Sequence, residues 1–181
     1  MDSVALFGGS FDPPHIGHIA IVKHLLKFDE IDTIIVMPTY LNPLKKQFFA
    51  PAKTRLKWLE KIFADNKKVH VNNYEVLQKQ KIPTLQSVEM LLKQYKKVFV
   101  VIGADNYATL NKWHRIDELK KKAEFIVATR GETKVPNEIK TIPLSLDISS
   151  TKLRENIEKY QEYLPPQILN EALGIYKKEK N

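Results

Sequence analysis

No cysteine occurs among the 181 residues of this sequence, which excludes disulfide bonds, thiolate zinc sites and cysteine nucleophiles. No apolar run approaches the roughly 20 residues that a membrane-spanning helix needs. The N-terminal segment lacks the basic region of a signal peptide, and its apolar stretch stops at Gly8. We therefore expect a cytoplasmic protein without a membrane segment.

Internal repeats, low-complexity segments and linkers that could divide the chain are also missing. A length of 181 residues suffices for one domain with a substantial core but is short for two. Hydrophobic residues make up 43% of the chain and charged residues 28%, as in ordinary globular proteins. We expect a single domain over residues 1–181, in which residues 148–181 form a helical C-terminal part.

The net charge is +8, from 29 basic and 21 acidic residues. A basic balance suits an anionic partner such as nucleic acid, a membrane surface or a phosphorylated metabolite. Much of the charge sits in short lysine runs, which are typical of solvated helix ends and faces. The charge therefore does not choose a partner, and a basic nucleotide- or RNA-binding module without catalysis stays open as an alternative.

The order of apolar patterns along the chain predicts an α/β fold. Four runs are almost continuously apolar, as expected for strands covered on both faces; they span residues 4–7, 33–37, 98–102 and 125–128. Helical patterns lie between them, in a stripe of Ile19, Val22, Leu25 and Leu26 and over residues 53–64 and 84–95. This alternation predicts a doubly wound, Rossmann-like parallel sheet with helices on both faces. Residues 149–160 and 165–177 are predicted to be two final helices, with no further strand.

Polar residues follow each predicted strand, where ligands bind in such sheets. The first strand leads into Gly-Gly-Ser-Phe-Asp-Pro-Pro-His-Ile-Gly-His at residues 8–18, and the others into Lys45 and Lys46, Gly103 and Asp105, and Arg130. Glycines, carboxylates, histidines and cations thus gather at one edge of the sheet. The sequence predicts a ligand site there.

The histidine-containing turn after the first strand has features of a phosphate site. Gly8 and Gly9 let the backbone bend sharply and admit a phosphate close to the main chain. Pro13 and Pro14 delay the helix until about His15, so we expect His15 and His18 on its first turn, whose free N–H groups and positive dipole end attract phosphate. Two imidazoles there can donate to oxygens that gain charge during phosphoryl transfer. A metal pair or packed core residues are the alternatives, and the surrounding motif favours phosphate.

A second helix start lies near the C-terminus. Ser149, Ser150 or Thr151 can cap a helix, and Arg154 lies one turn further on, where a guanidinium can bind an anion with two N–H groups. An ordinary cap with a surface arginine is the alternative. Two anion-attracting helix starts in one small domain suit a triphosphate better than a monophosphate.

Residues 7–18, FGGSFDPPHIGH, resemble the signature of the HxGH nucleotidyltransferase superfamily, and in particular that of its nicotinate and nicotinamide mononucleotide adenylyltransferases. Residues 148–154, ISSTKLR, are similar to the second family motif, ISSTxxR. Gly103-x-Asp105 followed by Trp113 resembles the third motif, and residues 173–176, LGIY, are similar to the usual ending. The resemblance covers essentially the whole chain.

This resemblance implies an enzyme that transfers AMP from ATP to nicotinate mononucleotide, giving deamido-NAD and pyrophosphate in NAD biosynthesis. Mg²⁺ would be carried with ATP, no metal would be held by the protein itself, and neither nucleic acid nor membrane would be a partner. The oligomeric state is not indicated.

The resemblance also assigns roles to individual residues. The catalytic residues would be His15 and His18. ATP and its phosphates would be bound by Gly8, Gly9, Ser10, Phe11, Lys45, Lys46, Ser149, Ser150, Thr151 and Arg154. Ribose would be bound by Gly103 and Asp105, and the nicotinate by Thr84 and Trp113, although core packing is the ordinary role of a tryptophan. Arg55 and Arg130 are further candidates, and for Arg55 an exposed position on a helix is the simpler explanation.

Related activities stay open as alternatives. Pantetheine-phosphate adenylyltransferases share several elements but usually carry Thr at the position of His15, and cytidylyltransferases differ around the second motif. Class I aminoacyl-tRNA synthetases are far longer. Nicotinate enzymes often have Ser-Tyr-Thr where this chain has Ile82-Pro83-Thr84, so one expected neighbour of the pyridine ring is missing. The compact length still favours nicotinate over nicotinamide.

Overall fold

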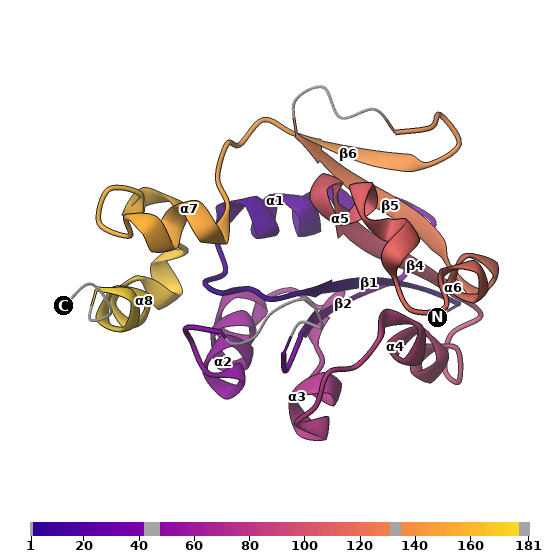
Figure 1. Ribbon diagram of the computed structural model, residues 1–181, viewed down its shortest axis with the longest axis horizontal. Helices are drawn as coiled ribbons and strands as arrows, with labels where there is room; N and C mark the ends of the chain where they lie inside the picture. The colour runs from indigo at the N-terminus through magenta and orange to yellow at the C-terminus, as the bar shows by residue number, and fades with distance from the viewer. Residues whose placement is uncertain (1, 42–47, 131–134, 178–181) are drawn as a thin grey trace.

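The computed structural model describes residues 2–41, 48–130 and 135–177. Within them, a parallel sheet of six strands has the order β3-β2-β1-β4-β5-β6 (Figure 1). The strands are β1 (Ser3–Gly9), β2 (Thr33–Pro38), β3 (Val69–Val71), β4 (Lys97–Gly103), β5 (Glu124–Arg130) and β6 (Lys140–Leu144). The strand order reverses at β1, which lies between β2 and β4, and such a switch point is where doubly wound sheets bind ligands. The predicted fold class is confirmed.

The continuous apolar runs are explained by burial on both faces of the sheet. Along β1, Ala5 and Phe7 point into one core cluster, while Val4 and Leu6 point into the other. Successive side chains of a strand face opposite sides, so a strand covered on both sides must be apolar at every position.

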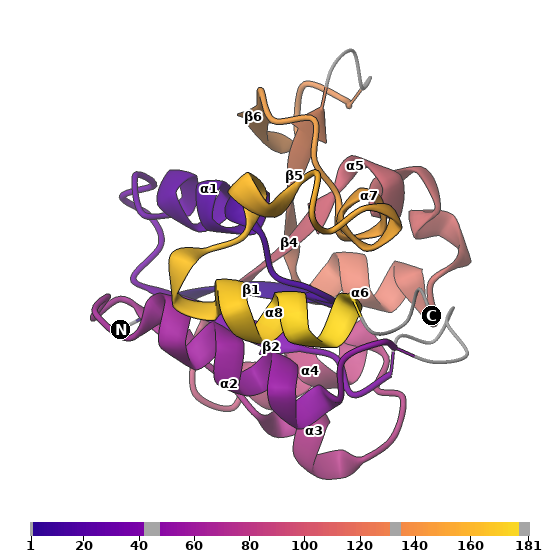
Figure 2. The ribbon, with the colours of Figure 1, turned by 90° about the vertical axis from the view of Figure 1, so that its left-hand side faces the viewer.

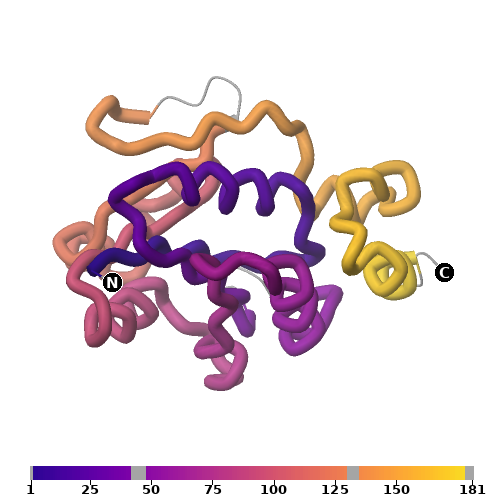
Figure 3. Tube along the Cα trace, turned by 180° about the vertical axis from the view of Figure 1, so that it is seen from behind, coloured from indigo at the N-terminus to yellow at the C-terminus, as the bar shows by residue number. Residues whose placement is uncertain are grey.

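Helices cover both faces. They are α1 (Ile16–Leu25), α2 (Ala52–Phe63), α3 (Tyr74–Gln78), α4 (Thr84–Leu91), α5 (Ala104–Ala108), α6 (Ile116–Lys122), α7 (Ser150–Glu155) and α8 (Leu169–Tyr176). Side chains of α1 and α2 contribute to one cluster and those of α4 and α6 to the other. Figure 3, seen from behind, shows α1 in indigo on the side nearest the viewer.

The C-terminal segment forms a third apolar cluster with α2. Trp58 of α2 is fully buried and packs with Leu153 of α7 and Ala172 and Tyr176 of α8. Its indole N–H also donates to Glu171 of α8 (3.1 Å). Figure 2 shows α8 in yellow above α2, at the end of the molecule where α7 also lies. The helical C-terminal part is therefore packed against the first half of the chain.

Several predicted boundaries were wrong. The helix predicted for residues 149–160 ends at Glu155, because Asn156 has an extended φ of −153°. The helix predicted for residues 165–177 starts with a 3-10 turn (Pro166–Ile168) and becomes α-helical only at Leu169. The helix predicted for residues 84–95 ends at Leu91.

Two strands were missed, β3 and β6. β3 has three residues, too few for a pattern. β6 buries only Ile142 and Leu144 and contains Pro143, which is tolerated because β6 is an edge strand and the proline has no N–H for the ladder.

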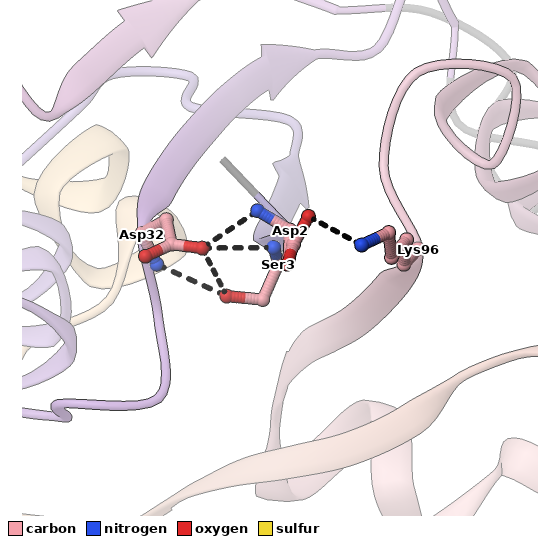
Figure 4. Close-up of polar contacts among 4 residues, drawn as sticks. All are labelled: Asp2, Ser3, Asp32 and Lys96. Carbon is pink, nitrogen blue, oxygen red and sulfur yellow. Dashed lines mark hydrogen bonds and ion pairs between the residues drawn. The ribbon is translucent and has the colours of Figure 1, made fainter.

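Polar residues at the amino ends of the strands serve to join elements. The carboxylate of Asp32 accepts hydrogen bonds from the main-chain N–H groups of Asp2 (2.8 Å) and Ser3 (3.0 Å), and from the Ser3 hydroxyl (3.2 Å) (Figure 4). These bonds, chiefly that from Asp2, lower the pKa of Asp32. The cluster ties the start of β1 to the residue before β2.

Among the described residues, no helix combines the length and apolar character needed to cross a bilayer. The cytoplasmic location stays a prediction.

Candidate active site

The histidine turn joins β1 to α1 and is fixed by the two imidazoles themselves. His15 is the N-cap of α1, and its Nδ1 accepts from the N–H of Gly17 (3.1 Å). The Nδ1 of His18 accepts in return from the N–H of His15 (3.1 Å). The two ring centroids are 3.8 Å apart. The structure thus brings the two predicted catalytic residues together in a capping box.

This arrangement determines where each imidazole carries its proton. A neutral imidazole has one donor and one acceptor nitrogen. Because each Nδ1 accepts from a main-chain N–H, the proton of each neutral ring lies on Nε2. The donor of each neutral ring is therefore its Nε2–H group, a kind of donor that suits the oxygens of a phosphate; the His15 side chain is buried and that of His18 is half-buried.

The expectation of free N–H groups on the first turn of α1 was wrong at Gly17 and His18. The N–H of Gly17 donates to His15 Nδ1, and that of His18 donates to the His15 carbonyl (2.9 Å). These amides are consumed by the cap. These two N–H groups are therefore not available to an anion.

Close packing explains the glycines and the phenylalanine of the motif. A Cβ on Gly17 would lie 2.9 Å from the His15 ring, so only glycine fits between the histidines. A Cβ on Gly9 would lie 3.0 Å from the ring of Phe11, which is itself 1% exposed and packs edge-on against His18 with centroids 4.9 Å apart. The Phe11 ring thus packs against His18 and holds its imidazole in place. Because this ring is buried, Phe11 can contact a ligand only through its main chain.

The second helix start meets the first, as Figure 1 shows for α7 and α1. The Ser150 hydroxyl donates to the carbonyl of Pro13 (2.9 Å). The guanidinium of Arg154 donates to the carbonyl of Asp12 and to the hydroxyl of Thr151 (3.1 Å). The two motifs are far apart in sequence and adjacent in space.

Ser149 is the N-cap of α7, where its hydroxyl accepts from the N–H of Lys152 (3.1 Å). The capping interpretation of this serine therefore holds. A role in binding phosphate stays a prediction.

Arg55 is completely buried, so the expectation of an exposed helix position was wrong. Its guanidinium donates to four main-chain carbonyls, those of Ser10, Thr39, Tyr40 and Ala50. Burial lowers the pKa of Arg55, and the negative charge of Asp12 opposes this shift. Through these hydrogen bonds, the buried Arg55 side chain joins the loop that follows β1 to the loop that follows β2.

The remaining predicted residues lie around β4. The last β1–β4 pair joins Phe7 to Val101, and Gly9 and Gly103 each follow it by two residues on their own strand. Gly103 ends β4 as the N-cap of α5, and a Cβ there would meet no atom within 4 Å. Asp105, in the first turn of α5, is exposed.

Thr84 is the first residue of α4 and is half-buried. Trp113 is half-buried against the core cluster on that face, so core packing accounts for part of its ring. Lys45 and Lys46 lie outside the described residues, as does the side chain of Arg130.

A cavity of about 470 Å³ lies beside the loop that follows β2, and its lining includes Tyr40, Phe48, Val76 and Lys79 along with Arg55. Among the described residues of the predicted site, Arg55 is the one that lines it. The lining comes from three separate segments, around residues 40–41, 48–55 and 76–79, so no local motif pointed to this cavity.

Sequence reasoning also missed two residues of the site, Asp12 and Tyr176. The carboxylate of Asp12 is buried and accepts from the hydroxyl of Tyr176 (2.5 Å). Both residues stand within motifs identified in the sequence, FDPP and LGIY, but their contact spans 164 positions. The one signal in the sequence was a carboxylate between an apolar residue and a proline, which could have indicated that Asp12 is buried.

Known proteins resemble this chain in sequence and in fold. A family model described as cytidylyltransferase-like matches residues 6–156. A protein of Sulfurimonas denitrificans named "Probable nicotinate-nucleotide adenylyltransferase" is 51% identical over 179 residues, covering 99% of this chain and 97% of the relative. One of the same name from Aliarcobacter butzleri is 41% identical, covering 98% and 99% of the two chains.

A solved structure has the same fold. Nicotinic acid mononucleotide adenylyltransferase of Plasmodium falciparum, complexed with NaAD, superposes with a TM-score of 0.79 at 18% identity, covering 98% of both chains. At that identity the likeness shows the architecture alone.

Proposed function

We propose that this chain, which belongs to the cytidylyltransferase-like family, transfers AMP from ATP to nicotinate mononucleotide. It belongs to the same family as proteins named nicotinate-nucleotide adenylyltransferase, to which it is up to 51% identical. The products are deamido-NAD and pyrophosphate. The observation that carries the proposal is the bond from Ser150 on α7 to Pro13 before α1 (2.9 Å). It places two helix beginnings side by side, where one polyphosphate can contact both.

The reaction is a single in-line displacement. The 5′-phosphate of the mononucleotide attacks the α-phosphorus of ATP, a new P–O bond forms, and the bond to pyrophosphate breaks. A phosphate nucleophile is already ionised at neutral pH, so no general base is needed. Catalysis then consists of positioning and stabilisation of charge.

His15 and His18 stabilise the oxygens of the α-phosphate. Their Nε2–H groups are oriented by the Nδ1 bonds to Gly17 and His15 (both 3.1 Å). Donors fixed before the reaction begins need no reorganisation as charge develops. The same bonds that start the helix thus prepare the catalytic groups.

Ser149, Ser150, Thr151 and Arg154 bind the β- and γ-phosphates. A guanidinium has five N–H donors, and Arg154 uses two groups to reach Asp12 and Thr151, so it keeps donors for phosphate oxygens while staying anchored. Gly8, Gly9 and Ser10, in the turn between β1 and α1, are proposed to contact the phosphates from the side opposite α7. Lys45 and Lys46 are proposed to add positive charge near the phosphates.

Mg²⁺ enters as part of the Mg·ATP substrate, because phosphate oxygens are the hard ligands that it prefers. Residues 2–41, 48–130 and 135–177 contain no cluster of three or more His, Asp or Glu side chains arranged to hold a metal ion. The protein's own contribution is to position the phosphates that carry the ion.

The mononucleotide lies beside β4. Gly103 leaves open space at the strand end, Asp105 accepts from ribose hydroxyls, and Thr84 and Trp113 flank the pyridine ring. The β1–β4 pairing ends at Phe7 and Val101, and Gly9 and Gly103 each lie two residues beyond it, which supports binding of the two substrates side by side at this edge of the sheet.

Pyrophosphate release from ATP tests this proposal. We expect release with nicotinate mononucleotide, and a lower kcat/KM with nicotinamide mononucleotide. Phosphopantetheine, or CTP in place of ATP, should support little turnover. Absence of release with every acceptor would leave a nucleotide-binding module, and a preference for the amide would reassign the substrate.

A further inference from the structure

Asp12 is a buried carboxylate whose oxygens are engaged by distant parts of the chain. The residue is 1% exposed. Its Oδ2 accepts from the N–H of Phe49 (3.0 Å), and its Oδ1 accepts from the N–H of Ala50 (2.9 Å) and the hydroxyl of Tyr176 (2.5 Å). A buried charge is stable only when it is hydrogen-bonded in this way.

The main chain of Asp12 is held as well. Its carbonyl accepts from Arg154, and the next carbonyl, of Pro13, accepts from Ser150. Asp12 stands three residues before His15 in the sequence. A shift of Asp12 would therefore displace the histidine cap and the start of α7 together.

Tyr176 joins this centre to the end of the chain. It is the last residue of α8 and is 3% exposed, with its ring near those of Trp58 (6.2 Å between centroids) and Phe49 (6.4 Å). Burial, followed by the charge of Asp12, raises the pKa of Tyr176, so the phenol stays protonated and donates. A phenylalanine could fill the same packing space, so the hydrogen bond to Asp12 is the role that requires a tyrosine here.

We infer that Tyr176 is a positioning residue of the active site, which acts through the carboxylate of Asp12 to hold the histidine turn against the beginning of α7. The inference rests on the proposed function, because positioning is measured as turnover. Phe49 extends the link: its N–H donates to Asp12, and its ring faces the Arg154 guanidinium at 5.0 Å. Helix α8 then supports the catalytic site from outside, without contacting substrate.

The first test is Tyr176→Phe, which removes one hydroxyl and keeps the ring. Misplacement of catalytic groups by about 1 Å can cost on the order of 10²-fold, and for this milder change we expect kcat to fall about tenfold. KM for each substrate should stay within about twofold, because Tyr176 contacts neither. A role in stability alone would lower the melting temperature and leave kcat of the folded enzyme unchanged.

Tyr163→Phe is the matched control. Tyr163 is a half-buried tyrosine that packs on the same C-terminal cluster, and the substitution makes the same chemical change away from Asp12. We expect its kcat to equal that of the unsubstituted protein. Equal losses in the two variants would overturn the inference.

A double-variant cycle tests whether Tyr176 acts through Asp12. Asp12→Asn alone should lower kcat by more than tenfold, and adding Tyr176→Phe should lower it no further, because coupled residues are non-additive. If the two substitutions together lowered kcat by the product of their separate effects, the inference would be contradicted. If the unsubstituted protein releases no pyrophosphate, the proposed function fails; if it is active and Tyr176→Phe matches it in kcat, only the positioning role fails.

Discussion

At the residue scale, the histidines show how one bond can serve structure and chemistry. Each Nδ1 completes the cap of α1, and the same bond fixes the proton of the neutral ring on Nε2. The motif in the sequence predicted that both residues lie at the start of this helix. It was not sufficient to show that the imidazoles replace the amides of Gly17 and His18 as anion donors, because that depends on the rotamers of both rings.

His18→Ala tests the role of this donor. We expect kcat for pyrophosphate release to fall on the order of 10²-fold, as for the loss of other oxyanion donors. The lost capping bond should cost about 1 kcal/mol of stability, which thermal unfolding measures separately. His24→Ala, in the last turn of the same helix, is the control and should keep its activity. Near-normal turnover in the His18 variant would remove this histidine from the mechanism.

At the element scale, helices α3 and α4 are joined by a buried carboxyl group. Glu75 of α3 is 5% exposed and accepts from the hydroxyl of Ser87 on α4 (3.2 Å). Burial raises the pKa of Glu75 to about 7 from its ordinary 4.5, while the Ser87 bond and the charge of Arg55 act in the opposite direction. The folded protein therefore binds a proton here that the unfolded chain has released at the same pH.

Glu75 should consequently make a pH-dependent contribution to stability. Between pH 4.5 and about 7 this group holds more protons in the folded state, so its contribution to the free energy of unfolding falls as pH rises and levels off above that window. Glu75→Gln keeps an acceptor for Ser87 and removes the titration. We expect the variant to gain up to about 3 kcal/mol over the unsubstituted protein at pH 8 and nothing at pH 4.

Urea unfolding at both pH values measures this difference, and Glu60→Gln on the exposed side of α2 is the control. A stability difference that does not change with pH would refute the assignment.

Elements were predicted well where burial imposes a long pattern and poorly where tertiary contacts decide. β1, β2, β4 and β5 are buried on both faces, and their apolar runs predicted them. β6 is a half-exposed edge strand, and its pattern was too weak. The end of α7 at Asn156 was missed as well, since no glycine or proline marks it in the sequence.

At the scale of the whole molecule, helix α8 contacts the segment that follows the first strand. Tyr176 bonds to Asp12, and Glu171 bonds to Trp58 across 113 positions. Such contacts carry no local signature, which is why the sequence predicted the two motifs of the proposed phosphate site but not the C-terminal link between them. Arg55, too, was taken for an exposed residue because its four carbonyl partners are brought together only by folding.

The proposed reaction is a direct displacement at a phosphate bound by two adjoining helix beginnings, without a protein nucleophile. Its stereochemical course can be measured with ATP that carries a chiral α-phosphorothioate and with nicotinate mononucleotide as acceptor. One in-line step inverts the configuration at the α-phosphorus, so we expect a dinucleotide product with inverted configuration. Retention would contradict it, because two displacements and a covalent adenylyl-enzyme would then be required.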